Sequence, residues 1–199
     1  MILPLDYFQQ DDVLKLGQDL LGKYLMTQIE GELTGGMIVE VEAYRGPEDR
    51  ASHAWNNRRT RRTEVMYRVG GTCYVYCCYG IHALFNIVTH QAGTPHALLI
   101  RAIQPEIGIE TMLKRRKKPI LNRSLAGGPG SLTQALGIKL SHTGFLLKGP
   151  PIWVEDRGIS VDPSNILSSP RIGIDYAGED ALLPWRYRIK NNPWTSLPN

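Results

Sequence analysis

Apolar and polar residues alternate along two segments of the chain, and a period of two predicts β-strands. In the segment 36–44, two valines and an alanine alternate with Glu40, Glu42 and Tyr44. Successive side chains of a strand point to opposite faces. We therefore expect Glu42 and Tyr44 to project together from one face while the valines face a core.

The second alternating segment, 72–78, places two tyrosines on one face of a predicted strand. Tyr74 and Tyr76 are two residues apart and so project from the same side. Tyr79 follows, directly before a glycine that favours a turn. The segment 79–82 therefore predicts the turn of a β-hairpin whose second strand is 83–89, although the Asn-Gly signature of such turns is missing.

Other periodic segments predict helices and further strands. Asp11 or Asp12 can cap a first helix that ends around Gly22. Pro105 suits the first turn of a helix that runs to about residue 117, and Ser131 begins a capping-box pattern that predicts a short helix to residue 136. The remaining strands are expected at 25–28, 97–102, 152–155, 171–174 and 185–189. Because strands occur in neighbouring runs and helices are few, the predicted fold class is α+β with a largely antiparallel sheet.

The composition is that of an ordinary globular protein. A length of 199 residues allows a substantial hydrophobic core, so we expect residues 1–199 to form a single domain. Hydrophobic residues make up 42% and charged residues 21% of the chain, which excludes a disordered protein. The sequence shows no secretory signal and no apolar stretch as long as a membrane span. These features predict a cytoplasmic protein with no membrane partner, and nothing suggests more than a monomer.

The three cysteines, Cys73, Cys77 and Cys78, are odd in number and lack a Cys-x-x-Cys spacing. They argue against a disulfide scaffold and against a zinc site. We expect all three to be buried as small apolar side chains.

The distribution of positive charge is more informative than the net charge of +4. Six arginines lie between residues 50 and 68, at Arg50, Arg58, Arg59, Arg61, Arg62 and Arg68. A localised basic patch is typical of phosphate binding, and it favours nucleic acid as the partner. The basic block 114–118 fits better as a set of cations at the C-terminus of a helix.

A carboxylate, a histidine and several tyrosines suit one task, which is to hold an unstacked base and activate water beside it. Glu42, Tyr44 and His53 are the first candidates, because His53 follows a Gly-Pro turn that can return it to the face of the other two. Glu42 has the structural alternative of a solvent-facing carboxylate, and His53 that of a surface histidine. The tyrosines of the second segment, Tyr74, Tyr76 and Tyr79, have the alternative of core or cross-strand packing. A metal site at Glu42, Asp49 and His53 is disfavoured, since no HExxH or second compact pair accompanies them.

The glycine-rich loop 127–130 precedes a predicted helix but lacks the Gly-Lys-Ser/Thr ending of a nucleotide-binding loop. It is a structural turn or an anion site. Three function classes therefore remain: a nucleic-acid enzyme, a non-catalytic nucleic-acid-binding module with an aromatic stacking platform, and a small-molecule transferase. Glu42 argues against the module, because a stacking platform gains nothing from an acid facing its own base. The absence of a nucleotide-cofactor fingerprint argues against the transferase.

The order and spacing of several motifs resemble the alkyladenine (3-methyladenine) DNA glycosylase family. The resembling segments are 40–53, 71–80, Asn86, 99–102, 128–136, 171–174, 177–179 and 192–194. The resemblance extends from about residue 16 to residue 194. The chain departs from the family pattern at Cys77 and Cys78, where aliphatic residues are expected, at His82, where an aromatic is usual, and along 90–96.

The resemblance implies a base-excision-repair enzyme that acts as a monomer on double-stranded DNA containing damaged purines. Such an enzyme hydrolyses the N-glycosidic bond of alkylated or deaminated purines by base flipping, without strand cleavage, cofactor or metal. The implied general base is Glu42, which deprotonates a water that attacks C1′. Tyr44 and Tyr76 hold the flipped base between their rings, and His53 lies along its edge.

The same resemblance implies three further roles and a shape. Tyr79 intercalates at the gap left by the flipped nucleotide, and Asn86 excludes the exocyclic amine of guanine from the pocket. Arg101 contacts a DNA phosphate or supports the pocket. The implied architecture is a curved sheet with surrounding helices and a projecting β-hairpin.

Overall fold

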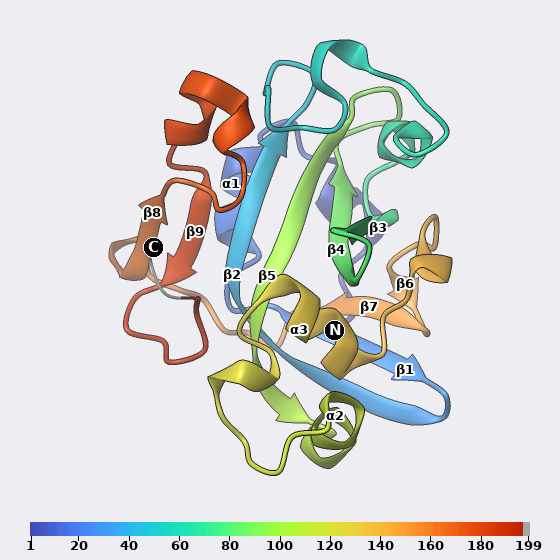
Figure 1. Ribbon diagram of the computed structural model, residues 1–199, viewed down its shortest axis with the longest axis vertical. Coiled ribbons are helices and arrows are strands. Elements are labelled where there is room, and N and C mark those ends of the chain that lie inside the picture. The colour runs from blue at the N-terminus through green and yellow to red at the C-terminus, as the bar shows by residue number, and fades with distance from the viewer. Residues whose placement is uncertain (197–199) are drawn as a thin grey trace.

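A computed structural model describes residues 1–196 and is organised around one curved sheet in which all strand pairs are antiparallel (Figure 1). The strands are β1 (Tyr24–Ile29), β2 (Glu32–Arg45), β3 (Cys73–Cys78), β4 (His82–Thr89), β5 (His96–Ile107), β6 (Lys148–Gly149), β7 (Ile152–Glu155), β8 (Ile166–Ser169) and β9 (Arg186–Ile189). Their order is β3-β4-β5-β2-β1-β7-β6, and β9 joins β2 and β8 beside this path. The predicted α+β class with an antiparallel sheet is confirmed.

The long strand β2 lies at the centre of the sheet and accounts for its curvature. One edge of β2 pairs with β5, while the other edge pairs with β1 up to Met37 and with β9 from Glu40 to Glu42. The register against β5 shifts between Ile38 and Glu40. A β-bulge bends a strand and increases its twist. β2 therefore bends close to the point where it changes partners, and the sheet curls around the face that carries Glu42.

Three α-helices and several 3₁₀ turns surround the sheet within the described residues. The helices are α1 (Val13–Asp19), α2 (Ile109–Arg116) and α3 (Pro129–Leu136). The 3₁₀ turns are Leu5–Gln9, Trp55–Asn57, Glu64–Tyr67, Arg123–Leu125, Leu140–His142, Pro163–Asn165 and Asp175–Leu182. Asp12 caps α1 as expected, since one carboxylate oxygen accepts the amides of Leu14 and Lys15 at 2.9 and 3.1 Å. None of the helices within residues 1–196 is long and apolar enough to cross a bilayer.

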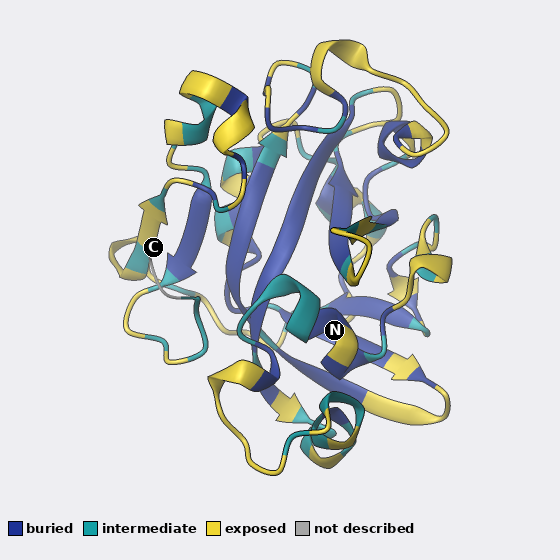
Figure 2. Ribbon diagram, viewed as in Figure 1, coloured by how far each residue is buried: buried dark blue, intermediate teal, exposed yellow. Residues whose placement is uncertain are grey.

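The main core lies on the face of β2 and β5 that α1 covers. Val41, Ala43 and Ile100 are fully buried there against Leu16 of α1 and Leu20, which directly follows α1. Glu42, which projects from the opposite face of β2, is fully buried as well, and the central strands of the sheet are buried along most of their length (Figure 2). The alternative of a solvent-facing Glu42 is therefore wrong.

The predicted hairpin is present, and its turn has the conformation that matches strand twist. Tyr79 and Gly80 both have positive φ, +51° and +73°, and the amide of Ile81 donates to the carbonyl of Cys78 at 3.2 Å. Two central residues with positive φ are the pattern of a type I′ turn.

Burial of all three cysteines was expected, and it is confirmed only for Cys73. Cys77 is exposed and Cys78 is partly exposed, because β3 is an edge strand whose far end extends beyond the elements that cover the sheet. The projecting end of β3 therefore keeps two thiols in contact with solvent.

Three boundaries differ from the predicted ones. Pro105 does not begin a helix, because β5 continues to Ile107 with Pro105 opposite Gly36, and α2 begins only after Gly108. Helix α3 begins at Pro129, with Gly128 as its N-cap, so the capping box at Ser131 is not used. The segment 171–174 is not a strand, because the backbone amide of Ile172 donates to the side chain of Glu42 and not to the backbone of a neighbouring strand.

The basic block after β5 lies where expected, in the last turn of α2. Arg115 donates to the carbonyl oxygens of Ile29 and Ala135 at 3.0 and 3.3 Å. These bonds tie α2 to β1 and α3, so the block has a structural role.

Candidate active site

The register of four neighbouring strands places distant residues in one row across the sheet. Tyr74 of β3 lies opposite Asn86 of β4, Asn86 opposite Leu99 of β5, and Leu99 opposite Glu42 of β2. Side chains opposite each other in a sheet share a face. The row therefore brings the acid, the amide and the aromatic candidates to one side of the sheet.

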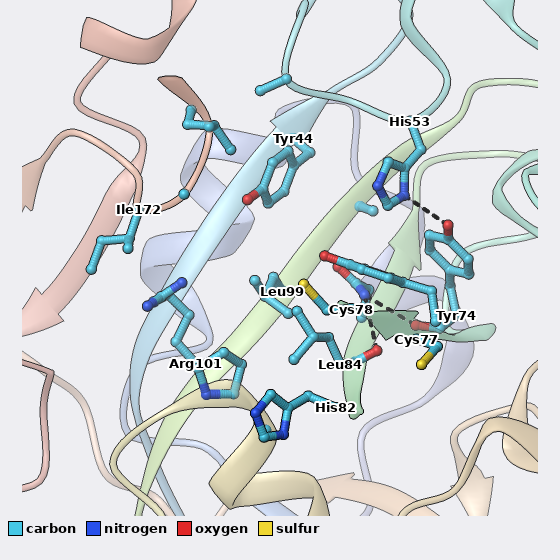
Figure 3. A pocket seen from close by; sticks show the side chains of 18 of the residues that line it. Tyr44, His53, Tyr74, Cys77, Cys78, His82, Leu84, Leu99, Arg101 and Ile172 are labelled. Atoms are coloured by element: carbon cyan, nitrogen blue, oxygen red, sulfur yellow. Dashed lines mark hydrogen bonds between the residues drawn. The ribbon is translucent and has the colours of Figure 1, made fainter. Parts of the chain in front are cut away.

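A pocket of about 650 Å³ opens above this row (Figure 3). Six predicted site residues line it: Tyr44, His53, Tyr76, Tyr79, Asn86 and Arg101. The glycine-rich loop and the start of α3 supply a further wall, from Gly128 to Ser131. A volume of this size holds a ligand as large as a nucleoside.

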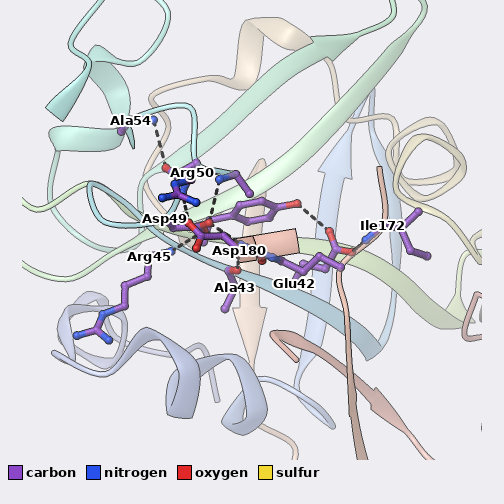
Figure 4. A network of polar contacts seen from close by, with 12 residues as sticks. Glu42, Ala43, Arg45, Asp49, Arg50, Ala54, Ile172 and Asp180 are labelled. Carbon is purple, nitrogen blue, oxygen red and sulfur yellow. Dashed lines mark hydrogen bonds and ion pairs between the residues drawn. The ribbon is translucent and has the colours of Figure 1, made fainter. Parts of the chain in front are cut away.

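Glu42 lies behind the pocket wall, and all of its contacts come from hydrogen-bond donors (Figure 4). One oxygen accepts the backbone amide of Ile172 at 2.7 Å and lies 3.2 Å from Nη1 of Arg101. The other oxygen accepts the hydroxyl of Tyr44 at 2.9 Å. A carboxylate offers about four acceptor positions, so the two hydrogen bonds and the ion pair leave room for a further donor.

Arg101 is held between two buried carboxylates. Its Nε lies 3.1 Å from Glu40 and its Nη1 lies 3.2 Å from Glu42. Burial opposes the charged form, but the charges of Glu42 and Glu40 prevail and raise the pKa of the Arg101 guanidinium. These two ion pairs hold Arg101 at the edge of the pocket and orient the carboxylate of Glu42.

A second buried ion pair, which the sequence analysis missed, joins the turn after β2 to the segment 171–174. The guanidinium of Arg171 binds both oxygens of Asp49 and donates to the carbonyl of Ala43 at 2.8 Å. Its Cζ lies 4.8 Å from the centre of the Tyr44 ring. Asp49, considered above as a metal ligand, is committed to this pair, and the pair positions the amide of Ile172 toward Glu42.

His53 lies against two tyrosines at the upper end of the pocket. Its Nδ1 lies 2.8 Å from the hydroxyl of Tyr74, and its ring is edge-on to Tyr76 with centroids 4.6 Å apart. Arg62 donates to Nε2 at 3.2 Å, so we assign the proton to Nδ1, which donates to Tyr74. Burial, and then the charges of Arg62 and Arg58, lower the pKa of His53 to about 4. The imidazole is therefore neutral at neutral pH.

The hydroxyl of Tyr44 stays protonated. Burial, and then the negative charge of Glu42, raise the pKa of Tyr44 well above its ordinary value. Burial likewise raises the pKa of Tyr76. Both rings therefore present neutral faces to the pocket.

Asn86 is a fixed part of the pocket floor and is only 3% exposed. Its amide nitrogen donates to the backbone carbonyls of Tyr74 and Leu84 at 3.1 and 3.4 Å. With its nitrogen held in this way, the side chain cannot rotate aside without losing buried hydrogen bonds.

Tyr79 lies at the tip of the β3–β4 hairpin. It is 85% exposed and also contributes to the lining of the pocket. An aromatic ring this exposed at a turn is free to contact a partner. Within residues 1–196 no cluster of three or more His, Cys, Asp or Glu side chains is placed to hold a metal ion.

Comparisons with known proteins agree on one family. The family model described as Methylpurine-DNA glycosylase (MPG) matches residues 6–193. A protein of Chlamydia felis is 50% identical over 191 residues, which cover 94% of this chain and 96% of the relative. A protein of Bacillus licheniformis is 45% identical over 196 residues, which cover 98% of this chain and 96% of the relative. Both relatives bear the name "Putative 3-methyladenine DNA glycosylase".

Proposed function

This chain belongs to the methylpurine-DNA glycosylase family, and from that premise we propose the reaction that its pocket performs. As a DNA glycosylase it is a hydrolase of DNA repair. We propose that it removes alkylated or deaminated purines from double-stranded DNA by flipping the damaged nucleotide into the pocket. Water attacks C1′, the free base is released, and the DNA strands stay intact.

The observation that carries this proposal is the environment of Glu42. Two hydrogen bonds and the ion pair with Arg101 fix its carboxylate, and they leave room for a water molecule to donate to it. Glu42 acts as the general base that takes a proton from this water. Its negative charge also stabilises the oxocarbenium-like sugar that forms as the glycosidic bond breaks.

The aromatic walls account for recognition of the base. Tyr44 and Tyr76 stack on the two faces of the flipped purine, and His53 lies at its edge. Stacking on an aromatic side chain stabilises a bound base by about 1–3 kcal/mol, and a cationic alkylated purine gains a cation–π term as well. The fixed amide of Asn86 disfavours undamaged guanine, whose exocyclic amine collides with it and which lacks the positive charge that 7-methylguanine brings to the cation–π contact.

The lining of the pocket supports water as the nucleophile. No lysine is among the described residues that line it, so no amine is placed to attack C1′ and form the Schiff base that precedes strand cleavage. A glycosylase without such an amine is monofunctional.

The surroundings of the pocket suit a DNA duplex. Tyr79 at the hairpin tip enters the minor groove and fills the space of the flipped nucleotide. The six arginines between residues 50 and 68 are exposed, and Arg50, Arg58 and Arg62 line a cavity beside the pocket. These arginines contact phosphates of the duplex. We propose that one protein molecule acts on one lesion.

A base-release assay tests this function directly. Duplex oligonucleotides that each carry one 3-methyladenine, 7-methylguanine, hypoxanthine or ethenoadenine are incubated with excess enzyme, with and without later alkali. Base release with strand breaks only after alkali is expected, and extensive EDTA treatment should leave the rate unchanged. Binding without base release from any lesion would instead favour the non-catalytic module, and breaks without alkali would contradict a monofunctional mechanism.

A further inference from the structure

Arg62 enters the aromatic pocket from the arginine-rich segment. We propose that Arg62 determines lesion specificity, because its unpaired guanidinium over Tyr76 disfavours cationic purines relative to neutral ones. This inference rests on the proposed function and adds a substrate preference to it. Relative to the same pocket without this charge, neutral purine lesions such as deaminated or cyclised bases would be favoured, and purines alkylated to a cation would be disfavoured.

Two contacts place Arg62 at the base-binding surface. Its Nη2 donates to Nε2 of His53 at 3.2 Å, and its Cζ lies 5.1 Å from the centre of the Tyr76 ring. It also lines the main pocket and a neighbouring cavity of about 510 Å³. Arg62 is thus the arginine of this segment that contacts both the histidine and a stacking tyrosine.

The charge of Arg62 is not neutralised within the described part of the chain. No ion pair among residues 1–196 involves it, whereas its neighbour Arg59 is paired with Glu64 at 2.7 Å. The same charge contributes to the low pKa of His53. A positive potential therefore reaches the ring that we expect to stack on the base.

This potential acts differently on the two classes of lesion. A cationic purine on Tyr76 brings a second positive charge close to the guanidinium, and like charges at this short separation repel each other. A neutral purine presents lone pairs on its ring nitrogens or carbonyl oxygen, to which a guanidinium can donate. The two cations also compete for the same aromatic face.

The closing experiment measures the ratio of the excision rates of two lesions, because a general loss of DNA affinity lowers both rates and cancels in their ratio. Single-turnover excision of 7-methylguanine, a fixed cation, and of hypoxanthine, a neutral base, is measured in the same duplex for wild type, Arg62→Gln, Arg62→Lys and Arg61→Gln. Glutamine keeps a donor for His53 without the charge, and lysine keeps the charge. Arg61 is the matched control, since it is an exposed arginine in the same turn.

Arg62→Gln should raise the ratio of 7-methylguanine to hypoxanthine excision by about fivefold or more. Arg62→Lys and Arg61→Gln should leave it near the wild-type value. A ratio that changes less than about twofold in Arg62→Gln, or equally in Arg61→Gln, overturns the proposal. So does a lysine variant that behaves like the glutamine variant. Wild-type protein that excises neither base would instead refute the proposed function.

An NMR titration of His53 gives a second readout that needs no activity. Removal of the nearby charge in Arg62→Gln should raise the pKa of His53 above about 4, and Arg61→Gln should leave it unchanged. An unchanged pKa in Arg62→Gln would mean that the guanidinium does not occupy the pocket, and the specificity role would fail with it.

Discussion

Replacement of Glu42 by glutamine removes the proposed general base while it keeps the shape of the side chain. In Glu42→Gln the remaining oxygen can still accept the amide of Ile172 and the guanidinium of Arg101. The new amide nitrogen can donate to the hydroxyl of Tyr44, which turns its own proton away. The substitution therefore changes the charge and the basicity of the group with little change in its packing.

The expected loss is large because two contributions disappear together. General base catalysis contributes about 10²–10⁴-fold, and an electrostatic contact to the developing charge is worth about 10²–10³-fold. We expect single-turnover excision to fall by at least about 10³-fold, or about 4 kcal/mol in the activation free energy. Affinity for lesion-containing DNA should stay nearly the same.

Glu40→Gln is the matched control for this experiment. Glu40 is on the same strand, is fully buried and binds the same arginine, but its other contacts are to Ser196 and Arg186. Both variants should lose about 1–3 kcal/mol in the free energy of unfolding, because Arg101 keeps one of two carboxylates. Only Glu42→Gln should lower the rate of excision by more than tenfold.

Two results would refute this reasoning. Excision by Glu42→Gln within about tenfold of wild type, a difference below about 1.4 kcal/mol, would exclude Glu42 as the base. Equal losses of excision in Glu40→Gln and Glu42→Gln would mean that the charge balance around Arg101, and not the basicity of Glu42, supports the reaction.

Three further predictions concern the hairpin, the histidine and the second ion pair. Tyr79→Ser should slow excision of a lesion in a matched duplex by about tenfold or more, but should slow it much less when the lesion lies opposite a destabilising mismatch. The reason is that an intercalated Tyr79 offsets an unstacking cost of a few kcal/mol, which is smaller at a mismatch. Equal losses on the two substrates would exclude intercalation by Tyr79. With a pKa of about 4 when folded and about 6.5 when unfolded, His53 stabilises the protein fully above pH 6.5, and this contribution is lost as the pH falls toward 4. Between pH 7 and pH 5 the wild type should therefore lose about 1–2 kcal/mol more unfolding free energy than His53→Gln, and parallel losses in a denaturant titration would contradict the low pKa. Asp49→Asn should lower the free energy of unfolding by about 3–5 kcal/mol, because it leaves buried Arg171 unpaired. The control Glu48→Gln changes an exposed residue and should alter the melting temperature little. Similar melting temperatures for the two variants would argue against a stabilising Asp49–Arg171 pair.

The local pattern predicted most elements but failed where tertiary contacts overrode it. Alternation located β2 and β3, and the capping aspartate located α1. Pro105 was placed in a helix because proline favours a first turn, yet the approach of Gly36 keeps it in β5: a Cβ on Gly36 would lie 2.2 Å from the carbonyl oxygen of Gln104. Nothing in the sequence around Gly36 or Pro105 indicates that the two strands approach each other so closely.

The sequence by itself determined that Glu42 and Tyr44 share a face of one strand, that Tyr74 and Tyr76 share a face of a second strand, and that Tyr79 lies at a turn. It could do so because the side-chain period of a strand is set by local geometry. The motif order also indicated the family, which the comparisons confirm.

Only the tertiary structure decided which distant groups meet. The pairing of Asp49 with Arg171, the donation from Ile172 to Glu42 and the place of Arg62 over Tyr76 depend on chain closure and on strand register. A charged or amide group gives no sign in sequence of the partner it finds more than a hundred residues away. Burial then makes that partner necessary, because a polar group removed from water is stable only when it is hydrogen-bonded or paired.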